Sequence, residues 1–291
     1  MSKLTATVTN LPLSDSVNPP YVLLFSGGNI DTNSNSETNT FKWDGANWTQ
    51  LFPDTIPTSP YGNSWKGRMA YDTFRQKWVM VNPWGQTWEF DGTDWAIVGS
   101  YPYGPGVLSF DKNIKKTIIT GNTIVATWDG SVWETVYNMN MNAGTYGPAV
   151  CFSDVNNYLL MYSPNTQETF YYDAINNSVT QLYPVTIPTI NSPISMLTFN
   201  YNTNRAILYG WAASDSRYGF WEWDGTDWIF GALTPGQPSE TAICYDPGTG
   251  GVILFGGSGS NMDETWLYQN SSVSILNPQT SPGRTIENMM A

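Results

Sequence analysis

The chain has 291 residues, only 12% of them charged, and 24 acidic against 12 basic residues give a net charge of −12. Because so acidic a chain repels phosphate backbones, and no run of 18 apolar residues occurs, we expect no nucleic-acid partner and no membrane insertion. The chain contains no histidine, which excludes a His-based triad and imidazole metal ligands.

Residues 1–19 belong to no repeat, and they lack an apolar core long enough for a signal peptide. We interpret them as a leader that docks on the rest of the chain or on a neighbouring subunit. Residues 20–291 are then one repeat domain.

A short phrase of aromatic, Asp, Gly, two residues and Trp recurs through this domain. Asp-Gly favours a tight turn between two strands. Clear copies are Trp43–Trp48, Phe90–Trp95, Trp128–Trp133 and Trp223–Trp228, and degenerate copies begin at Tyr172 and Tyr268. Repeats 38 to 51 residues apart are typical of propellers and solenoids, so we predict six units. A Trp that recurs in this way predicts packing between units.

Each unit reads as four short strands, a to d, joined by turn signals. Unit two gives Arg68–Asp72, Trp78–Val81, Thr87–Gly92 and Trp95–Val98. Unit six gives Glu240–Tyr245, Gly251–Phe255, Glu264–Tyr268 and Val273–Leu276.

Unit one begins with strand b, Tyr21–Gly28, and has no strand a before it. The C-terminal segment Pro282–Ala291 aligns with Gly67–Ala70 of unit two. We therefore predict an all-β, six-bladed β-propeller of four-stranded antiparallel blades, in which Arg284–Ala291 supplies strand a of the first blade and closes the ring.

The chain resembles a kelch-type β-propeller, in the galactose-oxidase-like superfamily, over about residues 20–291. The resemblance rests on the Gly27-Gly28 and Gly256-Gly257 doublets after strand b and on Arg68–Asp72 in strand a. Units two to five lack the double glycine. The copper oxidases of this family use His ligands, so we expect this chain, which has no histidine, to lack their copper site.

The loops indicate where binding would occur. In a propeller the b–c loops and d–a connections share one face, and here the b–c loops of units five, six and one are long. Loops on rigid scaffolds usually carry binding, and exposed aromatics are frequent anchors. The alternative is that these aromatics plug the channel or pack under loops. Candidate ligand or partner residues are Trp84, Trp211, Tyr103, Tyr146, Asp215, Arg217 and Asp263.

Two further features concern metals and thiols. Asp31, Asn33, Asn35 and Glu37 place oxygen ligands at alternate positions, as calcium loops do, although a solvated loop gives the same pattern. We expect no cofactor. Cys151 and Cys244 occupy the same strand position in units four and six, which are not neighbours, so we predict two free, buried thiols.

Composition favours a binding or assembly module over an enzyme. A carboxylate pair for glycoside hydrolysis is the remaining catalytic option. The chain is rich in Asn, Thr and Ser and poor in Lys, as extracellular proteins are, yet has no secretion signal. A virion component, such as a phage structural or host-attachment protein, fits both the extracellular composition and the missing secretion signal, because it is made in the cytoplasm and works outside the cell. A surface lectin and an intracellular kelch adaptor are the alternatives.

Overall fold

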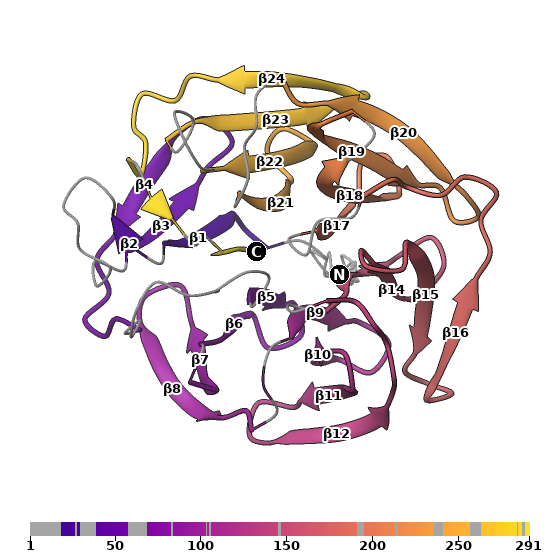
Figure 1. Ribbon diagram of the computed structural model, residues 1–291. Coiled ribbons are helices and arrows are strands. Elements are labelled where there is room, and N and C mark those ends of the chain that lie inside the picture. The colour runs from indigo at the N-terminus through magenta and orange to yellow at the C-terminus, as the bar shows by residue number, and fades with distance from the viewer. Residues whose placement is uncertain are drawn as a thin grey trace, which may run out of the picture.

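The computed structural model describes residues 19–26, 28–29, 39–57, 69–82, 84–102, 104, 106–144, 147–190, 195–212, 215–235, 241–256, 263–283, 285–286 and 289–291. Within these residues every regular element is a β-strand, and six four-stranded antiparallel sheets surround one axis (Figure 1). The innermost strands contact one another in succession around the axis, so the ring is closed. The predicted six-bladed propeller is confirmed.

The strands of each blade are named a to d from the axis outward, and their bounds are as follows. Blade 1 contains β26 (Met289–Met290), β1 (Val22–Ser26), β3 (Asn39–Trp43) and β4 (Trp48–Leu51). Blade 2 contains β5 (Met69–Asp72), β6 (Lys77–Val81), β7 (Gln86–Phe90) and β8 (Trp95–Ser100). Blade 3 contains β9 (Val107–Asp111), β10 (Lys116–Thr120), β11 (Ile124–Trp128) and β12 (Trp133–Asn138). Blade 4 contains β13 (Ala149–Ser153), β14 (Tyr158–Ser163), β15 (Glu168–Asp173) and β16 (Ser178–Leu182). Blade 5 contains β17 (Met196–Asn200), β18 (Arg205–Ala212), β19 (Arg217–Trp223) and β20 (Trp228–Leu233). Blade 6 contains β21 (Ala242–Asp246), β22 (Gly251–Phe255), β23 (Thr265–Gln269) and β24 (Ser272–Leu276).

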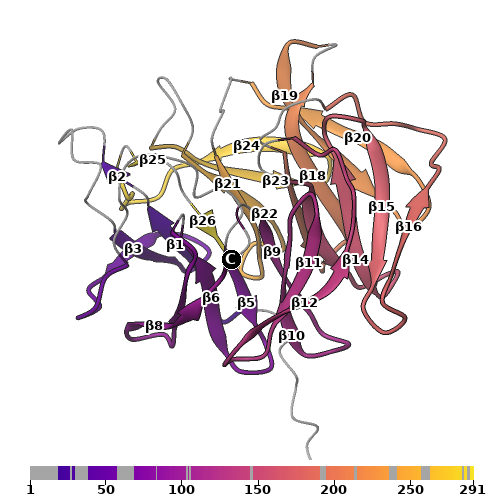
Figure 2. The same cartoon turned by 60° about the horizontal axis from the view of Figure 1, so that its bottom comes forward.

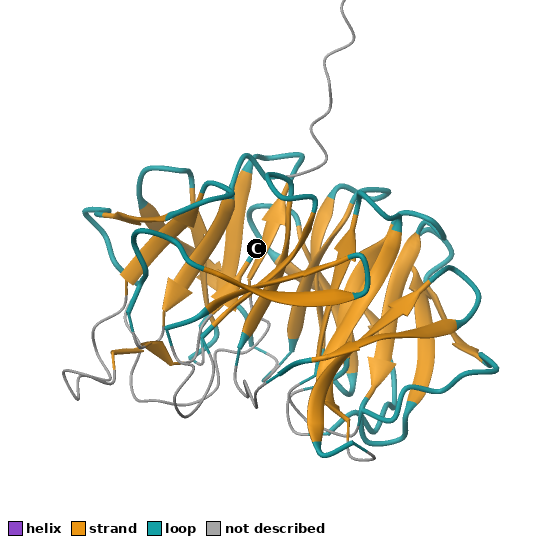
Figure 3. Ribbon diagram, turned by 90° about the horizontal axis from the view of Figure 1, so that it is seen from above, coloured by secondary structure: helices purple, strands orange, loops and turns teal. Residues whose placement is uncertain are grey.

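The ring has two faces, which Figure 3 shows from the side. The a–b and c–d turns form the turn face, and the b–c loops with the d–a connections form the connector face. Burial falls from the axis outward, because strands a and b are covered by the neighbouring blades on both sides. Strand β22 is buried throughout, whereas β24 at the rim is largely exposed. This gradient explains the continuous apolar runs of the b strands.

The C-terminal strand closes the ring, as predicted, but in a different register. Leu24 pairs with Met290 and Phe25 with Met289, so Met290 takes the place that Met69 has in blade 2. The alignment of Gly283-Arg284 with Gly67-Arg68 had placed this strand five residues too early. Residues Thr285–Ile286 (β25) instead pair with Gly28–Asn29 (β2), and the spacing of the pairs shows that both ladders follow one register.

Adjacent blades are joined by tryptophans of the repeated phrase, which are all buried. The indole N–H of the first residue of strand d donates to a buried threonine in strand c of the preceding blade. The four pairs are Trp48–Thr265 (2.9 Å), Trp95–Thr40 (2.9 Å), Trp133–Thr87 (2.7 Å) and Trp228–Thr169 (2.8 Å). Blades 4 and 6 have Val179 and Val273 in place of this tryptophan, and the blades that precede them have Val125 and Phe220 in place of the threonine. Donor and acceptor are therefore present together or absent together.

The aspartates of the repeated phrase are used within their own turns. Each carboxylate accepts backbone N–H groups two and three residues later, at 2.8–3.0 Å. These hydrogen bonds lower the pKa of each of them, with the Ser131 hydroxyl the largest cause for Asp129. These turn aspartates are Asp44, Asp91, Asp129, Asp173 and Asp224. The phrase is thus a structural device.

Strand a of every blade lines a cavity of about 150 Å³ on the axis. Two positions before its last residue, strand a carries a small side chain in blades 2 to 6, and in blades 4 and 6 this is cysteine. Cys151 and Cys244 are free and buried, as predicted. Burial raises the pKa of Cys244 to about 12 and that of Cys151 well above its usual range, so both thiols are protonated and inert.

Candidate binding face

The b–c hairpins of the connector face differ in length from blade to blade. In blade 3 the strands separate for three residues only, between Thr120 and Ile124. In blade 5, β18 and β19 have eight and seven residues and remain paired out to Trp211–Tyr218 and Ala212–Arg217. Figure 2 shows this hairpin rising beyond the other blades.

The blade 5 hairpin is braced from the side by the connection that leaves blade 4. Ile190 forms a β-bridge with Ala212 and is fully buried. The hydroxyl oxygen of Tyr162 holds this connection, since it lies 2.8 Å from the carbonyl oxygen of Pro188 and 2.9 Å from that of Ile190, and its single proton is shared between these two acceptors. A Cβ on Gly210 would lie 2.6 Å from the Ile190 side chain, so only glycine permits this approach. The connection that leaves blade 4 therefore packs directly against the projecting hairpin.

Three predicted site residues lie on this hairpin. Trp211 is half-buried and packs edge-on against Tyr218, with ring centroids 5.3 Å apart. Arg217 and Asp215 are exposed at its end. The sequence had placed all three in a loop, which is wrong for Trp211 and Arg217, because both are in paired strands. Because side chains alternate along a strand, Trp211 and Tyr218 lie on one face of the hairpin, and Arg217 lies on the other face, opposite Ala212.

Trp84 projects from a separate, tight turn in blade 2, and 53% of its surface is exposed. The buried Asn82 side chain fixes this turn, because its carbonyl oxygen accepts the backbone N–H groups of Trp84 (3.1 Å) and Gln86 (2.8 Å). Blade 2 is three blades from blade 5, so Trp84 and Trp211 lie on opposite sides of the ring and cannot form one compact site.

Asp263, in blade 6, is exposed, and its carbonyl accepts the Ser281 hydroxyl at 3.0 Å. The other predicted site residues, Tyr103, Tyr146, Asp31, Asn33, Asn35 and Glu37, lie outside the described residues. Sequence reasoning missed Ile190 and Tyr218, which support the hairpin. The apolar run from Ala206 to Ala212, which contains Gly210 but no charged residue and no proline, was the signal that a long strand begins there.

Among the described residues no group of three or more Asp, Glu or Cys side chains is placed to hold a metal ion. No helix able to cross a membrane occurs in the described part of the chain.

No protein-family model matches the chain, and no curated protein is significantly similar to it in sequence. The kelch assignment therefore remains a prediction. Solved structures match at 11–14% identity, which shows the propeller fold alone.

Three of these structures span most of the chain. TolB from Acinetobacter baumannii superposes with a TM-score of 0.61 and 14% identity over 93% of this chain; the match covers 66% of TolB, just under two thirds. The SapL1 lectin in complex with alpha methyl fucoside gives 0.55 and 14% identity, over 77% of this chain and 83% of that one. A chain of a Nidogen/Laminin complex gives 0.55 and 11% identity, over 93% and 98%.

Proposed function

We propose that this chain is a non-enzymatic binding and assembly module that binds a protein or glycan through its connector face. The observation that carries the proposal is the braced hairpin β18–β19, which presents Trp211, Asp215 and Arg217 beyond the other blades. Trp and Arg are frequent anchors of interfaces, and this hairpin presents one of each, on its two opposite faces. Little conformational entropy is lost when a preformed hairpin binds.

We further propose that the assembly is a virus particle and that the chain serves in its structure or in host attachment. The low charge and the Asn, Thr and Ser content support a protein that works outside cells. A surface lectin is the second candidate, which the likeness to the SapL1 lectin bound to a fucoside favours at the level of the fold. A kelch-type intracellular adaptor is the third.

Capture from the native source tests both levels of this proposal. Immobilised chain should retain one defined partner, and Trp211→Ala or Arg217→Ala should weaken the retention about tenfold or more. Phe74→Ala is the matched control, because Phe74 is 61% exposed on the turn face. Retention of virion proteins supports the particle, and retention of glycans that depends on Trp211 supports the lectin. A monodisperse monomer that retains nothing, or equal loss in the Phe74 variant, would overturn the proposal.

A further inference from the structure

A second concave site lies on the other face of the ring, in the seam between blades 5 and 6. It is a cavity of about 280 Å³ between the a–b turn and strand b of blade 5 and the c–d turn of blade 6. Its polar lining includes Asn200, Arg205, Glu222, Tyr268 and Ser271. Blades 5 and 6 are adjacent in the ring (Figure 1), where β20 contacts β24, and Phe220 of β19 stacks on Tyr268 of β23 with ring centroids 4.1 Å apart.

The centre of this seam pocket is a buried carboxylate, that of Glu222, which is only 7% exposed. One of its oxygens accepts the Tyr268 hydroxyl and the Ser271 hydroxyl (3.2 Å), and the other accepts Nη1 of Arg205 at 2.7 Å. Burial, then the hydrogen bond to Glu222, raises the pKa of Tyr268 well above its usual value, so its hydroxyl is a neutral donor. The pocket therefore contains one negative and one positive group and is electrically balanced.

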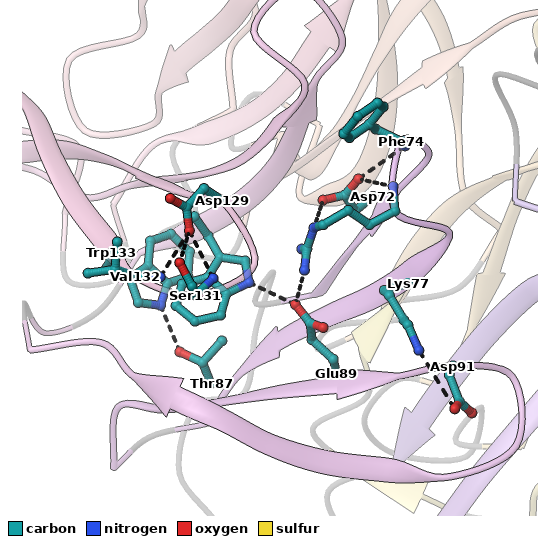
Figure 4. A network of polar contacts seen from close by, with 12 residues as sticks. Asp72, Phe74, Lys77, Thr87, Glu89, Asp91, Asp129, Ser131, Val132 and Trp133 are labelled. Carbon is teal, nitrogen blue, oxygen red and sulfur yellow. Dashed lines mark hydrogen bonds and ion pairs between the residues drawn. The ribbon is translucent and has the colours of Figure 1, made fainter.

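The seam between blades 2 and 3 contains a closed version of the same network (Figure 4). Glu89, at the strand position of Glu222, accepts Nε1 of Trp128 (2.8 Å) and a guanidinium nitrogen of Arg75. There the guanidinium has a second carboxylate, since Nε of Arg75 donates to Asp72 at 2.7 Å. Two acids thus hold this arginine, and one of them, Glu89, also accepts the Trp128 indole N–H.

The seam of blades 5 and 6 differs at the positions that would close it. Asn200 replaces Asp72, Tyr268 replaces Trp128 and Val273 replaces Trp133, according to the strand pairing. The second carboxylate is lost and two indoles become smaller side chains. Thr203 takes the position of Arg75, and Arg205, at the position of Lys77, supplies the guanidinium instead. Arg205 has a single carboxylate partner, and about a third of its side chain is exposed beside the cavity.

We propose that the seam pocket binds a single neutral sugar residue, whose hydroxyls are held by Arg205, Glu222 and Ser271. A sugar hydroxyl both donates and accepts, and the pocket offers a guanidinium, a carboxylate and a hydroxyl within one small volume. An anion would meet Glu222 and a cation would meet Arg205, which favours an uncharged ligand. The volume is at the low end of the roughly 300–1,000 Å³ of small-molecule sites, which suits one ring rather than an oligosaccharide. The site is separate from the connector face and does not depend on the function proposed for that face.

Titration calorimetry or ligand-observed NMR on the full chain, with neutral methyl glycosides as probes, tests this site. A glucuronide and glucosamine are the charged comparison probes, and we expect one neutral glycoside to bind better than either. Arg205→Lys keeps the charge balance but removes the planar fork, and should weaken binding about tenfold or more. Thr203→Trp, at an exposed lining position, should block the pocket while leaving the buried network intact.

Arg75→Lys makes the same exchange in the closed seam and should leave sugar binding unchanged. A melting temperature close to that of the parent chain shows that each variant folds. Absence of binding by every neutral glycoside, or binding that persists in both Arg205→Lys and Thr203→Trp, would overturn the site. Binding lost in Trp211→Ala but retained in Arg205→Lys would also overturn it, and would place the glycan on the connector face.

Discussion

Replacing Thr87 with valine tests whether the Trp–Thr pairs stabilise the ring. Thr87 is fully buried, and its hydroxyl accepts the indole N–H of Trp133 at 2.7 Å across the seam between blades 2 and 3. Valine has nearly the same shape but no acceptor. The indole N–H would then be buried without a partner, which costs about 1–3 kcal/mol.

The expected change in melting temperature follows from the size of the chain. An unfolding entropy of about 2.1 cal/mol/K per residue gives about 0.6 kcal/mol/K for 291 residues. A loss of about 1–3 kcal/mol therefore lowers the melting temperature by about 2–5 °C. Differential scanning calorimetry at pH 7 measures this directly.

Thr117 provides a matched control within blade 3. Its hydroxyl is also fully buried but has no hydrogen-bond partner. Thr117→Val removes an unsatisfied polar group, so the melting temperature should stay the same or rise. Equal changes in the two variants would refute the view that the indole hydrogen bond, rather than threonine itself, stabilises the seam.

Four further predictions concern acids and ring closure. Asp111→Asn should leave the melting temperature unchanged or raise it by about 1–2 °C at pH 7. Burial raises the pKa of Asp111, one of its carboxylate oxygens has no hydrogen-bond partner, and Asn200 makes the same turn in blade 5. A clear fall in the melting temperature by calorimetry would contradict this. Asp246→Asn should lower it by about 2–5 °C, because the amide would face the Trp43 indole N–H that Asp246 accepts at 3.0 Å; no change would show that this bond contributes little. Deleting residues 289–291 should cost about 3–6 kcal/mol from burial of two methionines alone, and a near-parental urea midpoint would disprove closure by β26. The turn aspartates have lowered pKa values in the folded state, so their contribution to the free energy of unfolding is complete above about pH 4 and is lost as the pH falls through those lowered pKa values. Thermal melts between pH 7 and pH 2.5 that show stability rising below pH 4 would contradict this.

The sequence revealed the blades because every blade meets the same local requirement. A tight turn must be followed by a side chain that fills the seam to the preceding blade, so Asp-Gly and Trp recur at fixed offsets. Register was less visible. The Gly-Arg match placed the closing strand too early in the sequence. The strand that closes the ring is instead Met289–Met290, whose apolar side chains are buried between the first blade and its neighbours.

The sites were predicted less well, because a long loop and a long hairpin span the same number of residues. The pairs Trp211–Tyr218 and Ala212–Arg217 distinguish them, and the hairpin is supported there by Ile190, in the connection that leaves blade 4. The seam pocket combines residues from two blades and has no local signature. Its one trace in the sequence was the degenerate phrase at Tyr268, where Gln, Asn and Val stand in place of Asp, Gly and Trp.

Closure by β26 also delays the pairing of β1 during biosynthesis. Leu24 pairs with Met290, which is translated about 265 residues later. At roughly 5–20 residues per second, β1 spends about 13–53 seconds without its inner neighbour. During that interval its open edge is a template for strands from other nascent chains. The net charge of −12 opposes contact between such unfinished rings during this interval, so it matters before the native state exists.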